Sequence, residues 1–528
     1  MHLLSTTAVL TLALAGLLAP AASVAQDDRL PDIGSSAGSV LSPAQQQQYG
    51  EMTLSQLRNY GYTLDDPLLG GWLQAMGERL GASSDQPRQP FTLFLLRERQ
   101  INAFATLGGY IAVNAGLILA ADREDEVAAV VSHEIAHVTQ SHVLRGVERA
   151  QRDSVPILLA MLGAIAVAQS SGGNSSDDAM MAAVMSAQGL MAQRQIDYTR
   201  GNEAEADRIG IRTLARSGYD PKAMADFFEK LQRVVRTGQG SERERTPDYL
   251  QTHPVTLTRI SEARERAKQI ATTDKPFIPT GGGSDNPLLP ASLHITMAAR
   301  GDSGEFPWAR ERLRVLSADT PAAAIREYER MARAGKLDDA QRYGLALARL
   351  LDGHAAEAAS ELTPLLDAHP GDVWLTLALA QAEARAGRHA AADARFEALL
   401  ARMPNHRAVA LTYAGMLDER NTPAAGKRAQ AVLRPLLGSA ADDPVFQQTF
   451  ARASEIAGDP VRAGEAYAEA AYLNGRPEQA LVQLNILKKR DDLDYYARAR
   501  IDARIAAITP TVLELRRQGI RDEDLDRR

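Results

Sequence analysis

The stretch His133-Glu134-Ile135-Ala136-His137 combines two metal-binding side chains with a carboxylate. On a helix, residues four apart are separated by about 40° around the axis, so His133 and His137 face the same way. Two neutral imidazoles one turn apart can bind one zinc ion. Glu134 lies beside them, where it can reach a water on the metal rather than the metal itself. The pattern therefore predicts a zinc site with a carboxylate placed for chemistry.

A third ligand is needed to complete this site. On a continuous helix His142 lies about 900° beyond His133, half a turn off the chelating face, so we expect it at the helix end, away from the metal. Glu203 and Asp207 are four residues apart and share a helix face, whereas Glu205 is about 200° from Glu203. We expect Glu203 to be the ligand and Asp207 to orient a metal-binding histidine. From charge alone, this helix could equally be a solvated acidic face.

The elements around these residues can be read from the pattern of apolar residues. Residues 122–143 fit a helix with Asp122 as a plausible N-cap. Residues 90–118 alternate between apolar and polar side chains around Leu107-Gly108-Gly109, which predicts a strand pair joined by a glycine turn. Residues 26–271, which follow the expected leader, are therefore expected to form one mixed domain. Within it, the apolar segment 156–168 is either a buried core helix or a lid that faces a membrane or a substrate.

Residues 1–25 are typical of a secretory signal peptide, with an apolar run before the small residues Ser23-Val24-Ala25. We expect export to a bacterial periplasm and no transmembrane helix in the mature chain. The sequence has no cysteine, which excludes a disulfide framework and a thiolate zinc site. The net charge of −7 argues against nucleic acid as a partner, because such binding needs basic patches.

A proline- and glycine-rich linker at residues 272–290 marks a change to alanine-, arginine- and leucine-rich helical sequence. Gly353 and Gly387 are 34 residues apart, and so are Pro370 and Pro404. Trp374, Ala378 and Phe396 occupy the large, small and aromatic positions of a tetratricopeptide repeat. We predict a linker and connecting helix at 272–310, about four repeats at 311–508 and a polar tail at 509–528. Generic helical hairpins are the alternative.

HEIAH followed by an ExxxD helix resembles the gluzincin peptidases, which include the CAAX prenyl proteases and the bacterial membrane-bound heat-shock proteases. INAFATLGG followed by VNAGLI, and the later THPVTLTRI, match the same family's pattern. The resemblance implies an α+β metallopeptidase domain at 26–271, mostly helical with a small sheet. An all-α tetratricopeptide-repeat solenoid would follow it.

The resemblance also implies roles for particular residues. It implies one Zn²⁺ per chain, held by His133, His137 and Glu203. It also implies that Glu134 is the general base. We count Asp207 with Glu134 among the catalytic residues, because it would orient a metal-binding histidine. His253 matches a loop histidine that can occupy the open zinc position and keep the enzyme latent; the alternative is a turn histidine before Pro254. Arg259 is expected to support the site.

For the reaction, we expect Glu134 to take a proton from the attacking water and return it to the leaving amine. We expect an edge strand, either Asn102–Ala105 or Val113–Gly116, to align an extended substrate by strand addition. The residues expected in this substrate strand are Asn102, Ala103, Phe104 and Asn114.

The leader and the repeats narrow the resemblance to a periplasmic type of this family. It implies an endopeptidase and chaperone-like factor that degrades misfolded or stalled outer-membrane β-barrel proteins and aids their assembly. The repeat groove would bind outer-membrane assembly machinery, and a peripheral membrane contact is compatible with this placement. The competing hypothesis is mainly a repeat-based binding scaffold with a latent peptidase domain.

Overall fold

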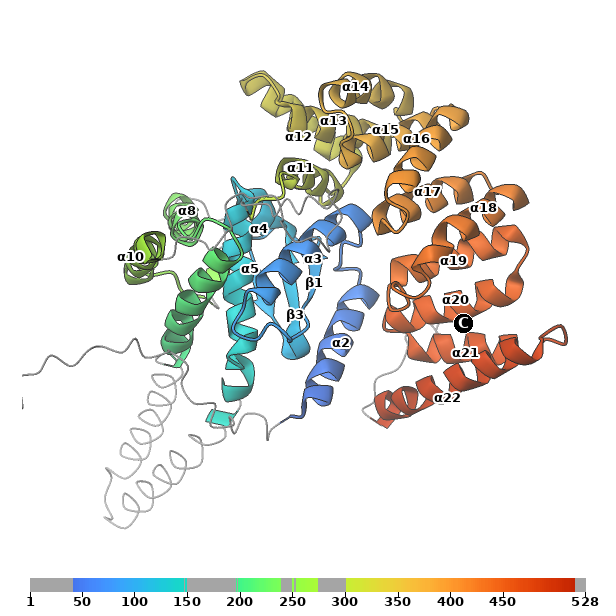
Figure 1. The fold of residues 1–528 in the computed structure, drawn as a ribbon, viewed down its shortest axis with the longest axis horizontal. Coiled ribbons are helices and arrows are strands. Elements are labelled where there is room, and N and C mark those ends of the chain that lie inside the picture. Colours follow the sequence, from blue (N-terminus) through green and yellow to red (C-terminus); the bar gives the residue numbers. More distant parts are fainter. Residues whose placement is uncertain are drawn as a thin grey trace, which may run out of the picture.

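The computed structural model describes residues 41–146, 148–149, 196, 198–238, 249–250, 253–273 and 301–517. Figure 1 shows a mixed α/β part in blue and green beside a curved stack of helices in yellow to red. The expected signal peptide, the apolar segment 156–168 and most of the linker lie outside the described residues. Within them, no helix has the length and apolar character needed to cross a membrane.

The small sheet has three strands in the order β1-β3-β2: β1 (Thr92–Leu96), β2 (Ala103–Ala105) and β3 (Tyr110–Asn114). β1 pairs in parallel with β3, and β2 pairs antiparallel with it, with Phe104 opposite Ala112. The short 3₁₀ helix η2 (Leu107–Gly109) joins β2 to β3, so the predicted strand pair with a glycine turn is confirmed.

Alternate strand residues face opposite sides of the sheet, because the side-chain period of a strand is two. Leu93, Leu95, Ile111 and Val113 join the main core with the helices α3 (Pro67–Ala82) and α5 (Glu124–Thr139). Phe94, Leu96, Tyr110 and Ala112 pack with Leu54 of α2 (Pro43–Asn59). Helices thus cover both faces of the sheet, and α5 packs on one of them.

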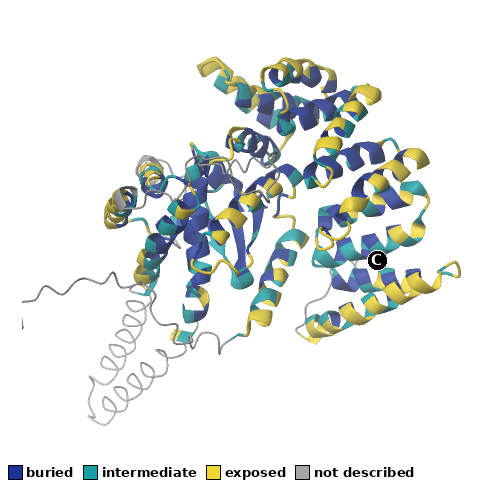
Figure 2. Cartoon of the chain, viewed as in Figure 1, coloured by how far each residue is buried: buried dark blue, intermediate teal, exposed yellow. Residues whose placement is uncertain are grey.

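Helix α5 carries the HExxH motif and begins one residue later than expected. Its N-cap is Arg123, not the predicted Asp122. The backbone N–H of Asp122 instead donates to the Glu126 carboxylate at 2.9 Å. Glu124, Asp125 and Glu126 fill the first turn, where negative charge is favoured by the helix dipole. Helix α5 is then buried along most of its length (Figure 2).

The remaining helices follow in chain order. The mixed part also has α4 (Ala115–Ala120), residues 198–216, α8 (Ala223–Gly238) and α10 (Leu257–Thr273). The helical stack consists of α11 (Phe306–Leu316), α12 (Pro321–Ala334), α13 (Asp339–Leu351), α14 (Ala355–Ala368), α15 (Val373–Arg385), α16 (His389–Arg402), α17 (Arg407–Glu419), α18 (Pro423–Leu433), η3 (Arg434–Leu436), α19 (Pro444–Ala457), α20 (Pro460–Leu473), α21 (Pro477–Lys488) and α22 (Tyr495–Arg517).

The helical stack has the features of a repeat architecture. Consecutive helices pack against one another from α13 to α22. Gly353 and Gly387, which define the 34-residue period, both adopt positive φ in the turns between helices, a conformation that glycine adopts without steric cost. Trp374, Ala378 and Phe396 are buried at the interfaces. The all-α fold predicted for this part is confirmed.

The two parts share one hydrophobic core. Phe306 of α11 lies 6.2 Å from Trp72 of α3, measured between ring centroids. Arg312 of α11 makes two hydrogen bonds to Asp66, the N-cap of α3, at 2.8 and 2.6 Å. Helix α11 extends across residue 310, the predicted boundary between the linker and the repeats. Helix α22 extends across residue 508, the predicted boundary between the repeats and the polar tail.

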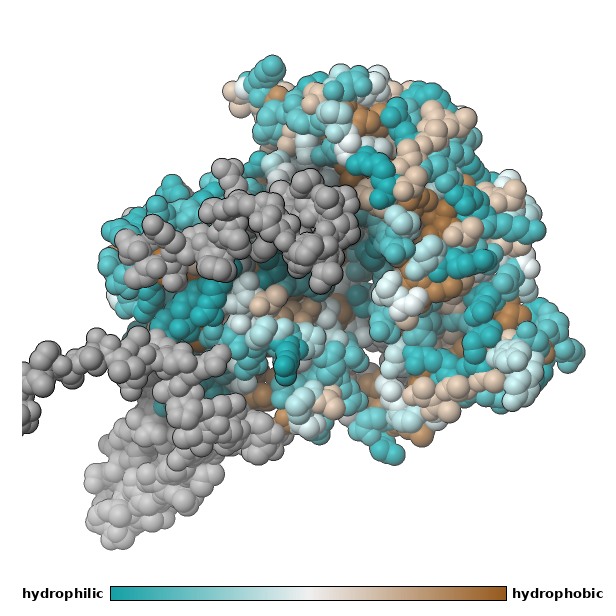
Figure 3. Space-filling view, in the orientation of Figure 1, coloured by the Kyte–Doolittle hydropathy of each residue, from teal (hydrophilic) through white to brown (hydrophobic). Residues whose placement is uncertain are grey.

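The helical stack curves back towards the mixed part at its other end. A Cβ atom on Gly475, in the turn between α20 and α21, would lie 2.6 Å from the backbone oxygen of Ser55 in α2. Helix α17 also contacts α3. In the space-filling view, apolar patches lie over the helical stack within a mostly hydrophilic surface (Figure 3).

Candidate metal centre

Helix α5 presents His133 and His137 to the same side, as their spacing predicts. The Nε2 atoms of the two rings lie 3.0 Å apart. His133 is fully buried and His137 is half-buried. Burial lowers the pKa of His137 to about 3, which keeps this imidazole neutral and available as a metal ligand.

The helix of residues 198–216 brings Glu203 to the same point. It packs closely on α5 because Gly210 has no side chain: a Cβ there would lie 3.2 Å from the Cα and N atoms of His133. Burial by itself would raise the pKa of the Glu203 carboxyl. Hydrogen bonds with His133, His137 and His253 outweigh burial and hold this pKa well below its usual range. Glu203 is therefore an ionised carboxylate.

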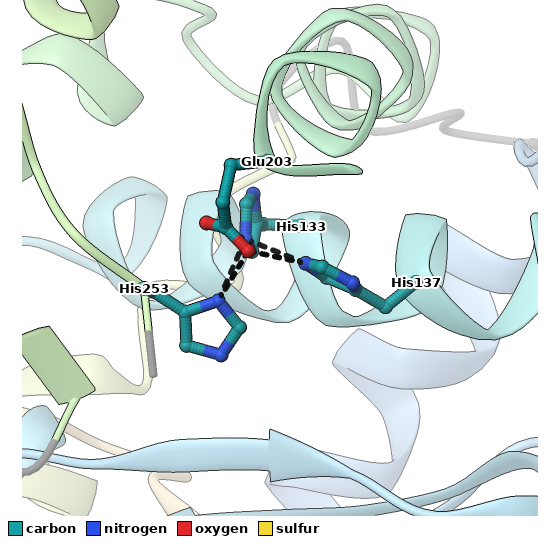
Figure 4. A group of neighbouring side chains, drawn as sticks. All are labelled: His133, His137, Glu203 and His253. Carbon is teal, nitrogen blue, oxygen red and sulfur yellow. Dashed lines mark hydrogen bonds and ion pairs between the residues drawn. The ribbon is translucent and has the colours of Figure 1, made fainter. Parts of the chain in front are cut away.

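His133, His137, Glu203 and His253 each offer one ligand atom, and these four atoms all lie within 4.8 Å of one another (Figure 4). Ligands held at 2.0–2.1 Å around a tetrahedral zinc ion lie roughly 3.3–3.4 Å apart. Glu203 oxygens lie 3.4 Å from His133 Nε2 and 3.3 Å from His137 Nε2. His253 Nδ1 lies 3.5 Å from His133 Nε2 and 2.9 Å from Glu203 Oε1. The donor set and its spacing fit a metal ion of this kind.

Asp207 lies behind His133, on the face that it shares with Glu203. Its Oδ1 is 3.1 Å from His133 Nδ1, the ring nitrogen that points away from the cluster. Arg259 of α10 binds both oxygens of Asp207, with Nε at 2.7 Å and Nη2 at 2.8 Å. Its Nη1 also lies 2.8 Å from a Glu203 oxygen. Arg259 thus ties together the two acidic residues that the sequence placed on one face.

Glu134 is held beside the cluster by one oxygen only. Its Oε2 accepts a hydrogen bond from the backbone N–H of Ala105 in β2 at 3.1 Å. Its Oε1 is buried without a hydrogen-bond partner among the described residues and faces His253 Nε2 at 3.7 Å. Burial raises the pKa of the Glu134 carboxyl. A buried carboxylate with a free oxygen and a raised pKa is suited to accepting a proton.

His253 enters the cluster from the segment before α10. Its backbone N–H donates to the Tyr249 carbonyl at 2.7 Å, and the two rings lie 4.7 Å apart at 30°. The ring therefore contacts the donor cluster with Nδ1 and faces Glu134 with Nε2. Tyr249 was not singled out from the sequence, which offers no motif for it.

His142 is not among the four donors, as expected, but it contacts His137 on the side that faces away from the cluster. Its Nδ1 lies 2.8 Å from His137 Nδ1, and its Nε2 lies 3.0 Å from Glu205. The helical extrapolation did not predict this contact, because α5 ends at Thr139 and Ser141 adopts a left-handed φ of 53°. Glu205, turned away from Glu203 as expected, meets His142 instead. Burial lowers the pKa of His142.

The residues expected in a substrate strand divide into two groups. β2, with Ala103 and Phe104, is an edge strand of the sheet and is directly preceded by Asn102. Asn114 ends β3, which lies between β1 and β2 and has no free edge. The alternative strand around Val113–Gly116 is therefore wrong, because strand order cannot be read from a local pattern.

A buried HExxH helix, a second helix with a carboxylate ligand and a proton acceptor beside them define a metallopeptidase. The family model of peptidase family M48 matches residues 67–267. A β-barrel assembly-enhancing protease of Yersinia pestis is 33% identical over 478 residues, covering 90% of this chain and 91% of that protein. One from Escherichia coli (strain K12) is 32% identical, covering 93% of both chains. The metalloprotease LoiP of the same strain is 30% identical over 181 residues, 34% of this chain and 63% of that protein.

The chain therefore belongs to peptidase family M48, in the group that the β-barrel assembly-enhancing proteases represent. This membership agrees with the resemblance seen in HEIAH and the ExxxD helix, and it makes the chain a metalloendopeptidase.

Proposed function

We propose that the chain is a zinc-dependent endopeptidase of the periplasm that degrades misassembled outer-membrane β-barrel proteins. The observation that carries the catalytic part is the position of Glu134, between a four-donor cluster and an edge strand. The β-barrel substrate class is proposed from the names of the relatives, and the periplasm from the leader-like residues 1–25.

In this proposal His133, His137 and Glu203 hold one zinc ion per chain, and Asp207 and Arg259 fix the orientation of His133 and Glu203. A zinc ion bound there would polarise the scissile carbonyl and lower the pKa of a bound water. Glu134 Oε1 takes the proton of the attacking water and later delivers it to the leaving amine. The Ala105 N–H keeps the other oxygen in place during both transfers.

The substrate would lie along β2 as an additional strand. In an antiparallel pair, alternate residues direct their N–H and C=O groups to the partner or away from it. Thr106 N–H donates to Tyr110, and Asn114 N–H donates to Asn102, so Asn102 and Thr106 face β3. Ala105, whose N–H reaches Glu134, faces the opposite way, as does Ala103. The N–H and C=O of Ala103 and the C=O of Ala105 are thus placed to pair with a substrate, since the Ala105 N–H already binds Glu134. Asn102 and Phe104 direct their backbone groups to β3 instead.

His253 is proposed as the group that keeps this site closed. Its ring occupies the position between the donor cluster and Glu134 where a water and a substrate carbonyl would meet. Displacement of the segment around His253 would open the position without disturbing His133, His137 or Glu203. The same contact favours the second candidate function, a binding scaffold whose peptidase domain rests in a latent state.

The repeats would supply binding in either case. A cavity of about 440 Å³ near the C-terminal end of the stack is lined by apolar residues together with arginines and glutamates. Phe450, Leu484 and Ile501 line it, and Arg500 and Arg504 pair there with Glu465 and Glu469. We propose that this groove binds the outer-membrane assembly machinery or an unfolded β-barrel protein.

The test compares the wild type with Glu134→Gln and His253→Ala in zinc content and in cleavage of casein. Glu134→Gln should lower cleavage by about 10²- to 10⁴-fold while zinc stays bound, because only proton transfer is lost. Removing zinc with a chelator should abolish cleavage, and adding zinc back should restore it. His253→Ala should raise cleavage, and Glu134→Gln combined with it should abolish that gain. Full activity in Glu134→Gln would contradict the assignment, and unchanged activity in His253→Ala would contradict the closed state.

A further inference from the structure

A line of hydrogen-bonded side chains runs from His137 away from the donor cluster. His137 Nδ1 lies 2.8 Å from His142 Nδ1, and the two rings meet edge to face at 78°. His142 Nε2 lies 3.0 Å from Glu205 Oε2, and Arg145 Nη2 binds the same oxygen at 2.7 Å. His142 is only 4% exposed, so these contacts take the place of water.

The positions of the protons in this line follow from the direction of His137. Its Nε2 faces the cluster, so the lone pair needed by a metal is at Nε2 and the proton is at Nδ1. This Nδ1–H can only donate, so His142 Nδ1 must accept. The proton of His142 then lies on Nε2, where it donates to Glu205. Each ring nitrogen of His142 thus has one partner, and the line ends at a carboxylate paired with Arg145.

We propose that His142 is a positioning residue for His137: supported by Glu205, it fixes the ring orientation and the tautomer in which His137 binds the metal. The inference rests on the metal centre of the proposed function and adds a support for its second histidine. His133 Nδ1 lies 3.1 Å from the carboxylate of Asp207, whereas His137 Nδ1 faces an imidazole with a carboxylate behind it. The two ligand histidines are therefore oriented by different chemical groups.

The backbone is shaped to make this contact. Helix α5 ends at Thr139, and Ser141 takes a left-handed conformation that is sterically unfavourable for a non-glycine residue. The chain then resumes a helix at 142–146, and Tyr198 O–H donates to the His142 carbonyl at 3.1 Å. A strained turn held in place from the Glu205 helix is what returns the His142 ring to His137.

The test measures zinc affinity by competition with a chelating indicator, and the absorption spectrum of the Co²⁺-substituted protein. All variants carry Glu134→Gln, so that self-cleavage does not deplete the samples. His142→Phe keeps the ring's shape and removes the acceptor, and it should weaken zinc binding by about 10- to 100-fold and shift the Co²⁺ bands. His142→Asn offers an oxygen near the position of Nδ1 and should restore part of the affinity. His389→Phe, an exposed histidine of α16, is the matched control and should bind zinc like the parent.

The outcomes separate this inference from the proposed function. If the parent protein binds no zinc, the proposed metal centre fails and the inference fails with it. If the parent binds zinc, His137→Ala loses it and His142→Phe matches the parent in affinity and spectrum, only the inference is overturned. Should His142→Phe show no cooperative thermal unfolding, the same measurements are made on Glu205→Ala. Weaker zinc binding of this variant supports the positioning role of His142, and parental affinity and spectrum overturn it.

Discussion

The metal centre and the helical repeats are both well buried, but by different kinds of side chain. Around His133 the core holds ionised groups, with Glu203, Asp207 and Arg259 all less than a tenth exposed. The core of the repeats instead holds large aromatic rings such as Trp374 and Phe396, together with small alanines. Charged pairs of the repeats, such as Arg428 with Glu397, lie largely at the surface.

This difference separates what each region does for the molecule. Burying a charge costs free energy unless partners satisfy it, so the metal centre is maintained by reciprocal hydrogen bonds. Burying an apolar ring is favourable by itself, at about 25 cal/mol per Å² removed from water. We infer that burial in the repeats contributes to the free energy of folding, whereas burial of charges in the metal centre costs free energy and preorganises the ligands. A change in the repeats should therefore leave zinc affinity intact, whereas a change that unpairs a buried charge of the metal centre should lower both zinc affinity and stability.

The largest effect is expected for Asp207→Ala. It removes the bidentate partner of Arg259 and the acceptor behind His133, leaving a buried guanidinium unpaired. The free energy of unfolding should fall by about 3–5 kcal/mol, and zinc affinity by about 10- to 100-fold. Chemical denaturation and an indicator titration measure the two losses. Asp207→Asn, which keeps the shape and one acceptor, should lose less; equal stability of Asp207→Ala and the wild type would contradict the comparison.

A smaller effect is expected for Gly344→Ala in α13. A Cβ there would lie 2.0 Å from the hydroxyl of Tyr328, a buried ring bonded to Glu311. Overpacking of this kind costs about 1–3 kcal/mol. Gly415→Ala in α17 is the matched control, because its Cβ meets nothing within 4 Å and alanine favours a helix. Thermal unfolding should show a lower melting temperature for Gly344→Ala than for Gly415→Ala, while zinc affinity stays unchanged in both. A loss of zinc affinity in Gly344→Ala would contradict the division between the regions.

The smallest effect concerns an exception within the repeats. Burial raises the pKa of Asp418 in α17 to about 7, against the opposing charge of Arg452, and its Oδ1 has no hydrogen-bond partner among the described residues. A raised pKa means that the folded chain holds the proton more tightly than the unfolded chain. Its stabilising contribution is complete below the unfolded value of about 4 and is lost as the pH rises through about 7. The melting temperature of Asp418→Asn relative to the wild type should therefore increase from pH 5 to pH 8, and a constant difference would contradict this.

The parts of the site that the sequence predicted all depend on local periodicity. His133 with His137, and Glu203 with Asp207, share faces because each pair is four residues apart on a helix that continues through both. The same rule correctly excluded His142 as a ligand but missed its contact with His137, because the helix does not continue beyond Thr139 and Ser141 reverses the backbone twist. Asn114 was misplaced because a strand's neighbours are chosen by tertiary packing.

The fold shows the same division between local and distant information. The 34-residue spacing of Gly353 and Gly387 identifies the turns between helices, since glycine adopts the positive φ of these turns without steric cost. The boundary at 310 was placed by composition, yet α11 runs through it. Its position is fixed by the pairing of Arg312 with Asp66, 246 residues away in sequence, which no local pattern contains.

The same α11 contacts bear on the order in which the molecule is completed during its synthesis. A chain is synthesised from its N-terminus, so the residues of the metal centre emerge before residues 301–316. Until that segment arrives, Trp72 lacks its Phe306 neighbour and Asp66 lacks Arg312. Glu124, at the start of the HExxH helix, also lacks the two hydrogen bonds from Ser303. The protease is thus finished by a helix made after its own catalytic residues, and a nascent fragment that ends before α11 would carry the full motif on an incomplete core.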